Sequence, residues 1–154
     1  MESIIKDLIK IYNLVPLDHE GGYFFRALGD DLPFSVIYYL MTKKSFSALH
    51  LLTVHEIWTF ISGDPIEQIT IGEEKKVHHT YIGEKGVDIG LSHVLPNIWQ
   101  GTRIKEGGQA GYALCTTTCV PGYRQEDFLL ATKEILPQLV SSNDLPFVRE
   151  FLAP

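Results

Sequence analysis

Cysteine and basic charge are both scarce in this chain. Its 154 residues include two cysteines, Cys115 and Cys119, and 13 basic against 19 acidic side chains, for a formal net charge of -6. The cysteines lie four residues apart in a predicted strand, which would hold their Cα atoms about 13 Å apart, whereas a disulfide needs about 7 Å or less. We therefore expect two small, buried thiols that do not bridge each other.

Several classes of sequence signal are also missing. No stretch clusters lysine and arginine with exposed aromatic residues, as a nucleic-acid surface would. The start of the chain lacks the basic region and apolar run of a signal peptide, and nowhere do about 18 apolar residues follow one another. No Ser-His-Asp order, phosphate loop or Cys-x-x-Cys pair occurs. We expect a cytoplasmic protein that binds neither nucleic acid nor membrane.

The hydrophobic content and its periodicity predict one mainly β domain over residues 1–154. At 45% hydrophobic residues, the chain is long enough for one sizeable core and too short for two typical domains. Apolar residues at helical spacing predict an amphipathic helix over about 2–13. Short strands at even spacing over about 22–132 predict a sandwich or barrel, and short helical pieces over about 133–152 follow.

Residues 47–65 are predicted to form two short strands joined by a tight connection. Because strands alternate faces, His50 on the first strand and Glu56 on the second can face the same space. Such a pair can bind a metal, exchange protons as an acid and base, or form a buried hydrogen-bonded pair that only fixes the local structure. The sequence alone leaves these three interpretations open.

The spacing of His50, Glu56 and Gly63 resembles the first motif of the cupin family. In that motif a second histidine stands at the position of Leu52, and the histidine of the second cupin motif falls near Gln100. Two ligands hold a metal poorly, so we expect no cofactor, and a divalent metal at His50 and Glu56 is the less favoured alternative.

Further strings resemble the small single-domain cupin_5 group, in the same order along the chain. They are Glu20-Gly21-Gly22-Tyr23-Phe24, an Ile-Tyr-Tyr-Leu string at residues 37–40, Trp99-Gln100 and Pro121-Gly122-Tyr123. The resemblance implies an all-β, cupin-type double-stranded β-helix, or jelly-roll barrel, with an N-terminal helix and short C-terminal helices. It also implies a homodimer.

Candidate site residues combine aromatic rings with a few polar groups, as small-molecule sites commonly do. Tyr112 and Thr118 lie on the more polar face of a predicted strand, and Tyr23 and Arg26 could hold an anionic group at the pocket mouth or form a dimer edge. The remaining histidines, His55 and His93 among them, have no partner at a useful spacing. The candidate catalytic residues are His50, Glu56 and Tyr112, and the candidate ligand-binding residues are Tyr23, Arg26, Trp58, Phe60, Trp99, Gln100 and Thr118.

By analogy with sugar-modifying cupins, we expect the barrel to bind a small polar, carbohydrate-like molecule, with metal-free isomerase or epimerase chemistry. This expectation rests on the fold alone. The alternatives are a metal-dependent cupin enzyme and a non-catalytic dimeric storage or scaffold protein.

Overall fold

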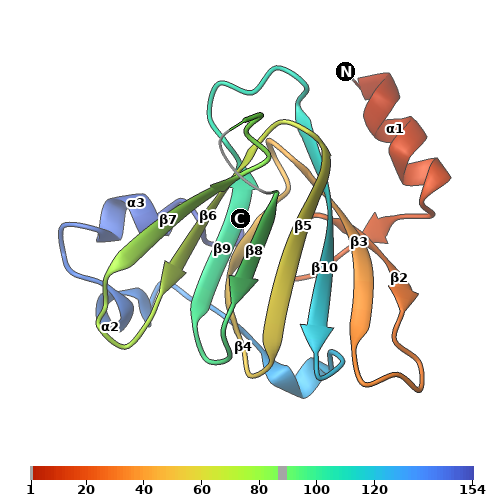
Figure 1. Cartoon of the computed structure of the whole chain (residues 1–154). Helices are drawn as coiled ribbons and strands as arrows, with labels where there is room; N and C mark the ends of the chain where they lie inside the picture. The colour runs from red at the N-terminus through yellow and green to blue at the C-terminus, as the bar shows by residue number, and fades with distance from the viewer. Residues whose placement is uncertain (1, 87–89) are drawn as a thin grey trace.

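The computed structural model describes residues 2–86 and 90–154, and antiparallel strands are its main secondary structure (Figure 1). One sheet has the order β1-β2-β3-β10-β5-β8 and the other has the order β11-β4-β9-β6-β7. This is the predicted all-β jelly roll. The elements are α1 (Glu2–Ile11), β1 (Val15–Pro16), β2 (Tyr23–Leu28), β3 (Ser35–Thr42), β4 (Ser47–Leu52), β5 (His55–Gly63), β6 (Ile66–Ile71), β7 (Val77–Ile82), β8 (Leu91–Val94), β9 (Trp99–Ile104), β10 (Tyr112–Val120), the 3-10 turn η1 (Gln125–Asp127), β11 (Phe128–Leu130), α2 (Leu136–Leu139) and α3 (Leu145–Arg149).

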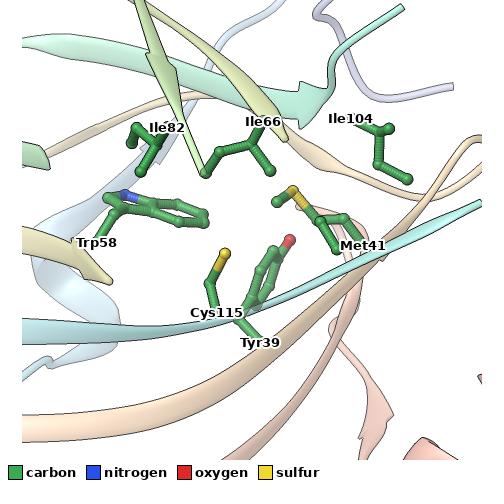
Figure 2. Close-up of a cluster of buried hydrophobic side chains, with 8 residues drawn as sticks. Tyr39, Met41, Trp58, Ile66, Ile82, Ile104 and Cys115 are labelled. Atoms are coloured by element: carbon green, nitrogen blue, oxygen red, sulfur yellow. The ribbon is translucent and has the colours of Figure 1, made fainter. Parts of the chain in front are cut away.

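The core between the two sheets is apolar at one end of the sandwich. Trp58 and Cys115 of the first sheet pack with Ile66 and Ile82 of the second (Figure 2). Tyr39 meets Trp58 edge to face, with ring centroids 5.6 Å apart. Alternation along β3, β5 and β10 leaves the inward-facing positions at the other end for the cavity described below.

Helix α1 covers the outer face of the first sheet. Its apolar residues Ile5, Leu8 and Ile9 pack against the buried Leu40 and Leu114. The helix ends at Ile11, two residues earlier than expected, because the chain turns through Asn13, whose φ is 52°, to bury Leu14. Figure 1 shows α1 and the C-terminal helices on opposite sides of the molecule.

The C-terminal segment covers the outer face of the second sheet. Leu49 of β4 lies in an apolar cluster with Leu136, Val148 and Phe151. A Cβ at Gly101 would lie 2.9 Å from Cδ1 of Phe151, so the aromatic ring needs a glycine opposite it. Both faces of β4 are therefore covered, which explains its nearly continuous apolar sequence.

Two composition-based expectations can be compared with the structure. Cys115 and Cys119 are buried, free thiols, as predicted. Within residues 2–86 and 90–154, no helix is long and apolar enough to cross a membrane.

Candidate functional site

A cavity of about 210 Å³ lies between the sheets, at the end that the apolar core leaves open. Its wall is largely hydrocarbon and aromatic, with a limited set of polar groups. The lining residues are Leu17, Glu20, Phe24, Arg26, Ser35, Ile37, Tyr39, His50, Leu52, Glu56, Trp58, Thr117, Cys119, Tyr123, Gln125 and Phe128.

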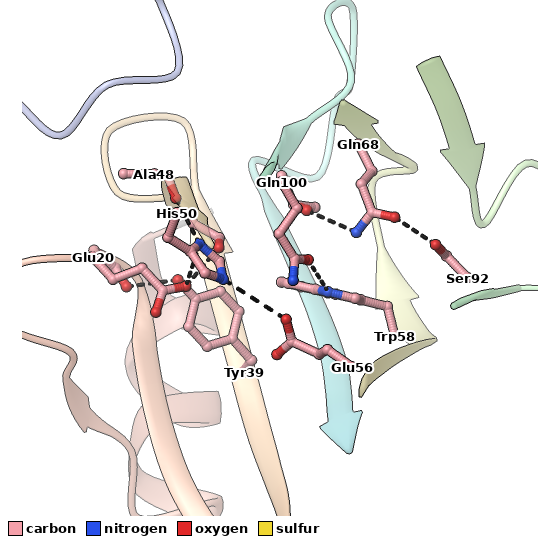
Figure 3. Close-up of polar contacts among 12 residues, drawn as sticks. Glu20, Tyr39, Ala48, His50, Glu56, Trp58, Gln68, Ser92 and Gln100 are labelled. Carbon is pink, nitrogen blue, oxygen red and sulfur yellow. Dashed lines mark hydrogen bonds and ion pairs between the residues drawn. The ribbon is translucent and has the colours of Figure 1, made fainter. Parts of the chain in front are cut away.

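A corner of the chain places His50 and Glu56 on facing walls of this cavity. β4 and β5 belong to different sheets, and only Thr53 and Val54 connect them. The backbone N–H of Thr53 donates to the carbonyl oxygen of Asp127 at 3.0 Å, and Thr53 Oγ1 donates to Asp127 Oδ1 at 2.7 Å. The strand alternation thus brings both side chains into one space, as predicted, with His50 Nε2 3.8 Å from Glu56 Oε2 (Figure 3).

His50 is held between two carboxylates. Its Nδ1 lies 2.8 Å from the carbonyl oxygen of Ala48, which can only accept, so Nδ1 carries a proton. Glu20 Oε1 lies 3.8 Å from the same Nδ1. Burial on its own would lower the pKa of His50, but the carboxylates of Glu20 and Glu56 outweigh it and raise the pKa to about 9. At neutral pH the ring is an imidazolium whose Nε2–H faces Glu56.

Glu20 is a site residue that the sequence analysis did not select. Ser47 Oγ donates to Glu20 Oε1 at 2.6 Å. Burial raises the pKa of the Glu20 carboxyl, and the nearby Glu56 adds to this, while His50 and Ser47 act in the opposite direction. The following glycines let the turn approach β3, because a Cβ on Gly22 would lie 2.4 Å from the hydroxyl oxygen of Tyr39. The Glu-Gly-Gly string is the signal that could have identified Glu20.

Two buried polar atoms beside His50 have no hydrogen-bond partner among the described residues. They are Glu56 Oε2 and Gln100 Nε2. Trp58 Nε1 donates to Gln100 Oε1 at 3.1 Å. Since an indole N–H can only donate, this bond fixes the orientation of the amide and leaves Nε2 without a partner. At 3.8 Å, the contact from Glu56 Oε2 to His50 Nε2 is too long for a hydrogen bond.

Tyr112 and Thr118 do not reach the cavity, which corrects the prediction from strand β10. The face of β10 that carries Cys115, Thr117 and Cys119 points inward, and Tyr112 packs in the cluster beneath α1. The bulky rings of Tyr39 on β3 and Trp58 on β5 point inward on either side of β10 and fill the space over its inner face. Small side chains are therefore needed there, and the outer face carries the larger ones.

Three of the predicted ligand-binding aromatics also lie elsewhere. Tyr23 packs on the outer face of the first sheet with the α1 cluster. Phe60 packs against the apolar core at the far end of the sandwich. Trp99 packs under the C-terminal helices on the outer face of the second sheet. Its neighbour Gln100 faces inward, behind Trp58, because successive strand residues point to opposite faces.

Arg26 lines the cavity and is exposed, so it lies at the mouth. Its guanidinium carbon lies 6.0 Å from the centroid of the Tyr123 ring. Tyr123 also lines the cavity, and the sequence analysis did not select it. Burial, together with Glu20 and Cys119, raises the pKa of Tyr123 to about 12, so its hydroxyl stays protonated at neutral pH.

The histidines expected to be isolated include one pair. His55 Nδ1 and His93 Nε2 lie 2.8 Å apart on the adjacent strands β5 and β8, with their rings stacked. This pair is exposed and does not line the cavity. The expectation that both histidines lack a partner was therefore wrong.

The donor set of the cavity does not fit a catalytic metal centre. In the described part of the chain, no three His, Cys, Asp or Glu side chains converge as a metal site would require. Glu20 approaches Nδ1 of His50 and Glu56 approaches Nε2, so the two carboxylates lie on opposite ring nitrogens. Leu52 offers no ligand atom, and the amide oxygen of Gln100 already accepts from Trp58.

Comparison with known proteins agrees with this fold. The Cupin_5 family of the cupin superfamily (DUF985) matches residues 6–131. A hypothetical protein from Leishmania major is 23% identical, with a TM-score of 0.83 over 97% of this chain and 98% of that one. A protein from Shewanella oneidensis is also 23% identical, with a TM-score of 0.86 over 97% of each chain.

A likeness to an enzyme is limited to the fold. Oxalate decarboxylase from Bacillus subtilis is 14% identical, with a TM-score of 0.58 over 82% of this chain and 34% of that one. At such identity the similarity carries no information about activity. No protein of curated function matches the sequence.

Proposed function

Since the chain belongs to the Cupin_5 family of the cupin superfamily, we propose that its barrel cavity binds a small polar molecule and that His50 and Glu56 exchange protons with it without a metal. One observation carries this proposal. His50 Nε2 and the unpartnered Glu56 Oε2 lie 3.8 Å apart, both buried, at the wall of a cavity of about 210 Å³.

The two side chains are spaced so that one ligand oxygen in the cavity could hydrogen-bond to both. A buried acceptor without a partner costs roughly 1–3 kcal/mol, so a pair with only a structural role would be expected to close to hydrogen-bond distance. A hydroxyl oxygen that sits beside the pair, at about 2.8 Å from each atom, can accept from His50 Nε2–H and donate to Glu56 Oε2.

Proton transfer next to a carbonyl group is the chemistry that this arrangement supports best. The imidazolium of His50 gives a proton to the carbonyl oxygen while the Glu56 carboxylate takes one from the adjacent carbon, which yields an enol. The enol returns its proton to His50. If the carbon takes back the proton from Glu56, the starting compound is restored; if it takes a proton from solvent on the opposite face, Glu56 releases its own proton to solvent and the product is the epimer. When the adjacent carbon carries a hydroxyl, His50 can instead take the proton of that hydroxyl while Glu56 gives its proton to the former carbonyl carbon, which moves the carbonyl group by one carbon and yields an isomer. No atom or electron is gained or lost in either case. A small carbohydrate-like molecule with a carbonyl group is one suitable substrate.

The two alternative functions have less support. A metal-dependent enzyme needs three or four protein ligands, which the cavity does not offer. A storage or scaffold protein has no use for an imidazolium and a carboxylate facing each other across a cavity.

We further propose a homodimer that uses the free part of strand β2. The short β1 pairs only with Tyr23 and Phe24, so within the described residues Phe25–Leu28 forms a sheet edge. Phe25 and Leu28 are 41% and 50% exposed. An exposed apolar edge of this kind favours pairing with a second chain.

The proposed chemistry is tested by solvent hydrogen exchange. The purified protein is incubated in D₂O with small aldoses, ketoses and 2-oxo acids, and ¹H NMR follows deuterium entry next to the carbonyl. At least one compound should exchange, and Glu56→Gln should slow this by roughly 10²–10⁴-fold. Glu74→Gln, which alters the exposed Glu74–His78 pair, is the matched control and should have no effect. Exchange that survives in Glu56→Gln, or no exchange with any compound, would contradict the proposal.

A further inference from the structure

Arg26 carries a free cationic group at the mouth of the cavity. It pairs in register with Ile37, and Phe24 two residues earlier pairs with Tyr39, so Phe24 and Arg26 share the face that looks into the cavity. Among the described residues, the guanidinium makes no ion pair or hydrogen bond, and its recorded contact is with the ring of Tyr123. Its N–H donors remain available to a ligand.

In the described part of the chain, no acidic side chain pairs with Arg26. Glu20 accepts from Ser47 and approaches His50 Nδ1, and Glu56 approaches His50 Nε2. Asp127, which does not line the cavity, accepts from Thr53 and pairs with Arg124. The cavity therefore has a donor-rich mouth at Arg26 and, at its buried end, a proton-exchanging pair.

The surface between these two ends is mainly apolar. Phe24, Ile37, Leu52 and Trp58 supply it. A sugar would place a hydroxyl on nearly every carbon against this hydrocarbon wall, at a cost for each hydroxyl left without a partner. A short carbon chain with polar groups at one end and an anionic group at the other matches the wall better.

Resting on the proposed function of this cavity, we infer that the ligand is a small carboxylic acid that also carries a carbonyl or hydroxyl oxygen. Its carboxylate binds Arg26, because a planar guanidinium matches a carboxylate with two parallel hydrogen bonds. Its second oxygen lies between His50 and Glu56. The cavity of about 210 Å³ is smaller than a drug-sized site of roughly 300–1,000 Å³, which limits the acid to about three to six carbon atoms.

Calorimetric titration tests this assignment. The probes are pyruvate, 2-oxobutyrate and 3-methyl-2-oxobutyrate, each compared with its methyl ester, together with arabinose and xylose. We expect an acid to bind and its ester to bind at least about tenfold more weakly. Arg26→Gln should weaken the acid by roughly tenfold to a hundredfold, and Arg26→Lys by less because it keeps the charge.

Arg149→Gln is the matched control, since Arg149 is an exposed arginine on α3 that does not line the cavity. It should leave binding unchanged. Arg26 makes no ion pair, so its variants should unfold at the wild-type temperature.

The outcomes separate the two proposals. A sugar that binds when no acid does, or an acid whose affinity survives Arg26→Gln, would overturn the ligand assignment and leave proton exchange at His50 and Glu56 in place. An acid could bind in an Arg26-dependent way while deuterium exchange does not respond to Glu56→Gln. That result would support the ligand assignment and overturn the proposed chemistry. If none of the probes binds, the ligand assignment is wrong.

Discussion

Replacing Glu56 by glutamine should make His50 a weaker base. Glu56 is one of two carboxylates that hold the pKa of the buried His50 near 9 against the effect of burial. The substitution keeps the size of the side chain and removes its charge. The desolvation of the ring is unchanged, so the pKa of His50 should fall toward its ordinary value, with Glu20 and the carbonyl oxygen of Ala48 left to raise it.

The size of the effect on stability follows from the same pKa. A histidine that rises from 6.5 unfolded to about 9 folded contributes about 3 kcal/mol to folding, at about 1.4 kcal/mol per pH unit. His50 is only 2% exposed, so solvent screening reduces this little. The contribution is fully present below pH 6.5 and is lost as the pH rises through about 9. In Glu56→Gln this alkaline loss should be smaller.

NMR titration of the six histidine rings measures the pKa of His50 directly, and a His50→Gln variant identifies its signal. Urea unfolding at a series of pH values measures the stability change. Glu74→Gln removes a carboxylate from an exposed histidine and should leave the His50 titration unchanged. A wild-type His50 that titrates near 6.5, or one that does not respond to Glu56→Gln, would refute the electrostatic reasoning.

Three further predictions concern packing, assembly and metal. Leu49→Ala should lower the free energy of unfolding in urea by about 2–5 kcal/mol, because Leu49 is fully buried under the C-terminal helices. Leu129 is 56% exposed, so the control variant Leu129→Ala should change the free energy of unfolding by about 0.5 kcal/mol or less. Sedimentation of the wild-type protein at roughly tens of micromolar should show a dimer. Phe25→Glu should dissociate this dimer, and a wild-type monomer would count against the β2 interface. Elemental analysis of protein purified without added metal should find far less than one metal per chain, and near-stoichiometric metal lost in His50→Ala would reverse the metal-free assignment.

Periodicity was enough to predict the strands and the pairing of His50 with Glu56. Each strand repeats every two residues, so which residues share a face follows from the sequence. The apolar spacing of α1 was equally clear because the helix packs by one face only. These features depend on local pattern and survive small errors in strand boundaries.

Periodicity alone does not show which face of a strand points into the sandwich. Along β10, alternation separates Tyr112 and Thr118 from Thr117 and Cys119, but only the inward-facing bulk of Trp58, beside Thr117 on the adjacent strand β5, decides that the second set faces the cavity. The same rule shows that Trp99 and Gln100 could not both have entered the site.

Glu20 was missed for another reason. It lies in a turn rather than in a strand, so no periodicity applies to it, and its contact with His50 depends on how closely that turn packs against β3. The contact between Tyr123 and the Arg26 guanidinium likewise depends on the packing of segments far apart in the sequence.

The corner at Thr53 and Val54 bears on how this sequence can change in length. His50 and Glu56 are close neighbours in the chain, yet the corner sets them on opposite sheets, and the contacts of Thr53 with Asp127 hold it in place. One residue added there would shift β5 by one position and turn Glu56 to the outside. The connection between β9 and β10 is held at its end by Asp64, which accepts from the N–H groups of Ala110 and Gly111, but its exposed tip at Glu106 and Gly107 does not line the cavity. Insertions should be tolerated at this tip and selected against at the corner.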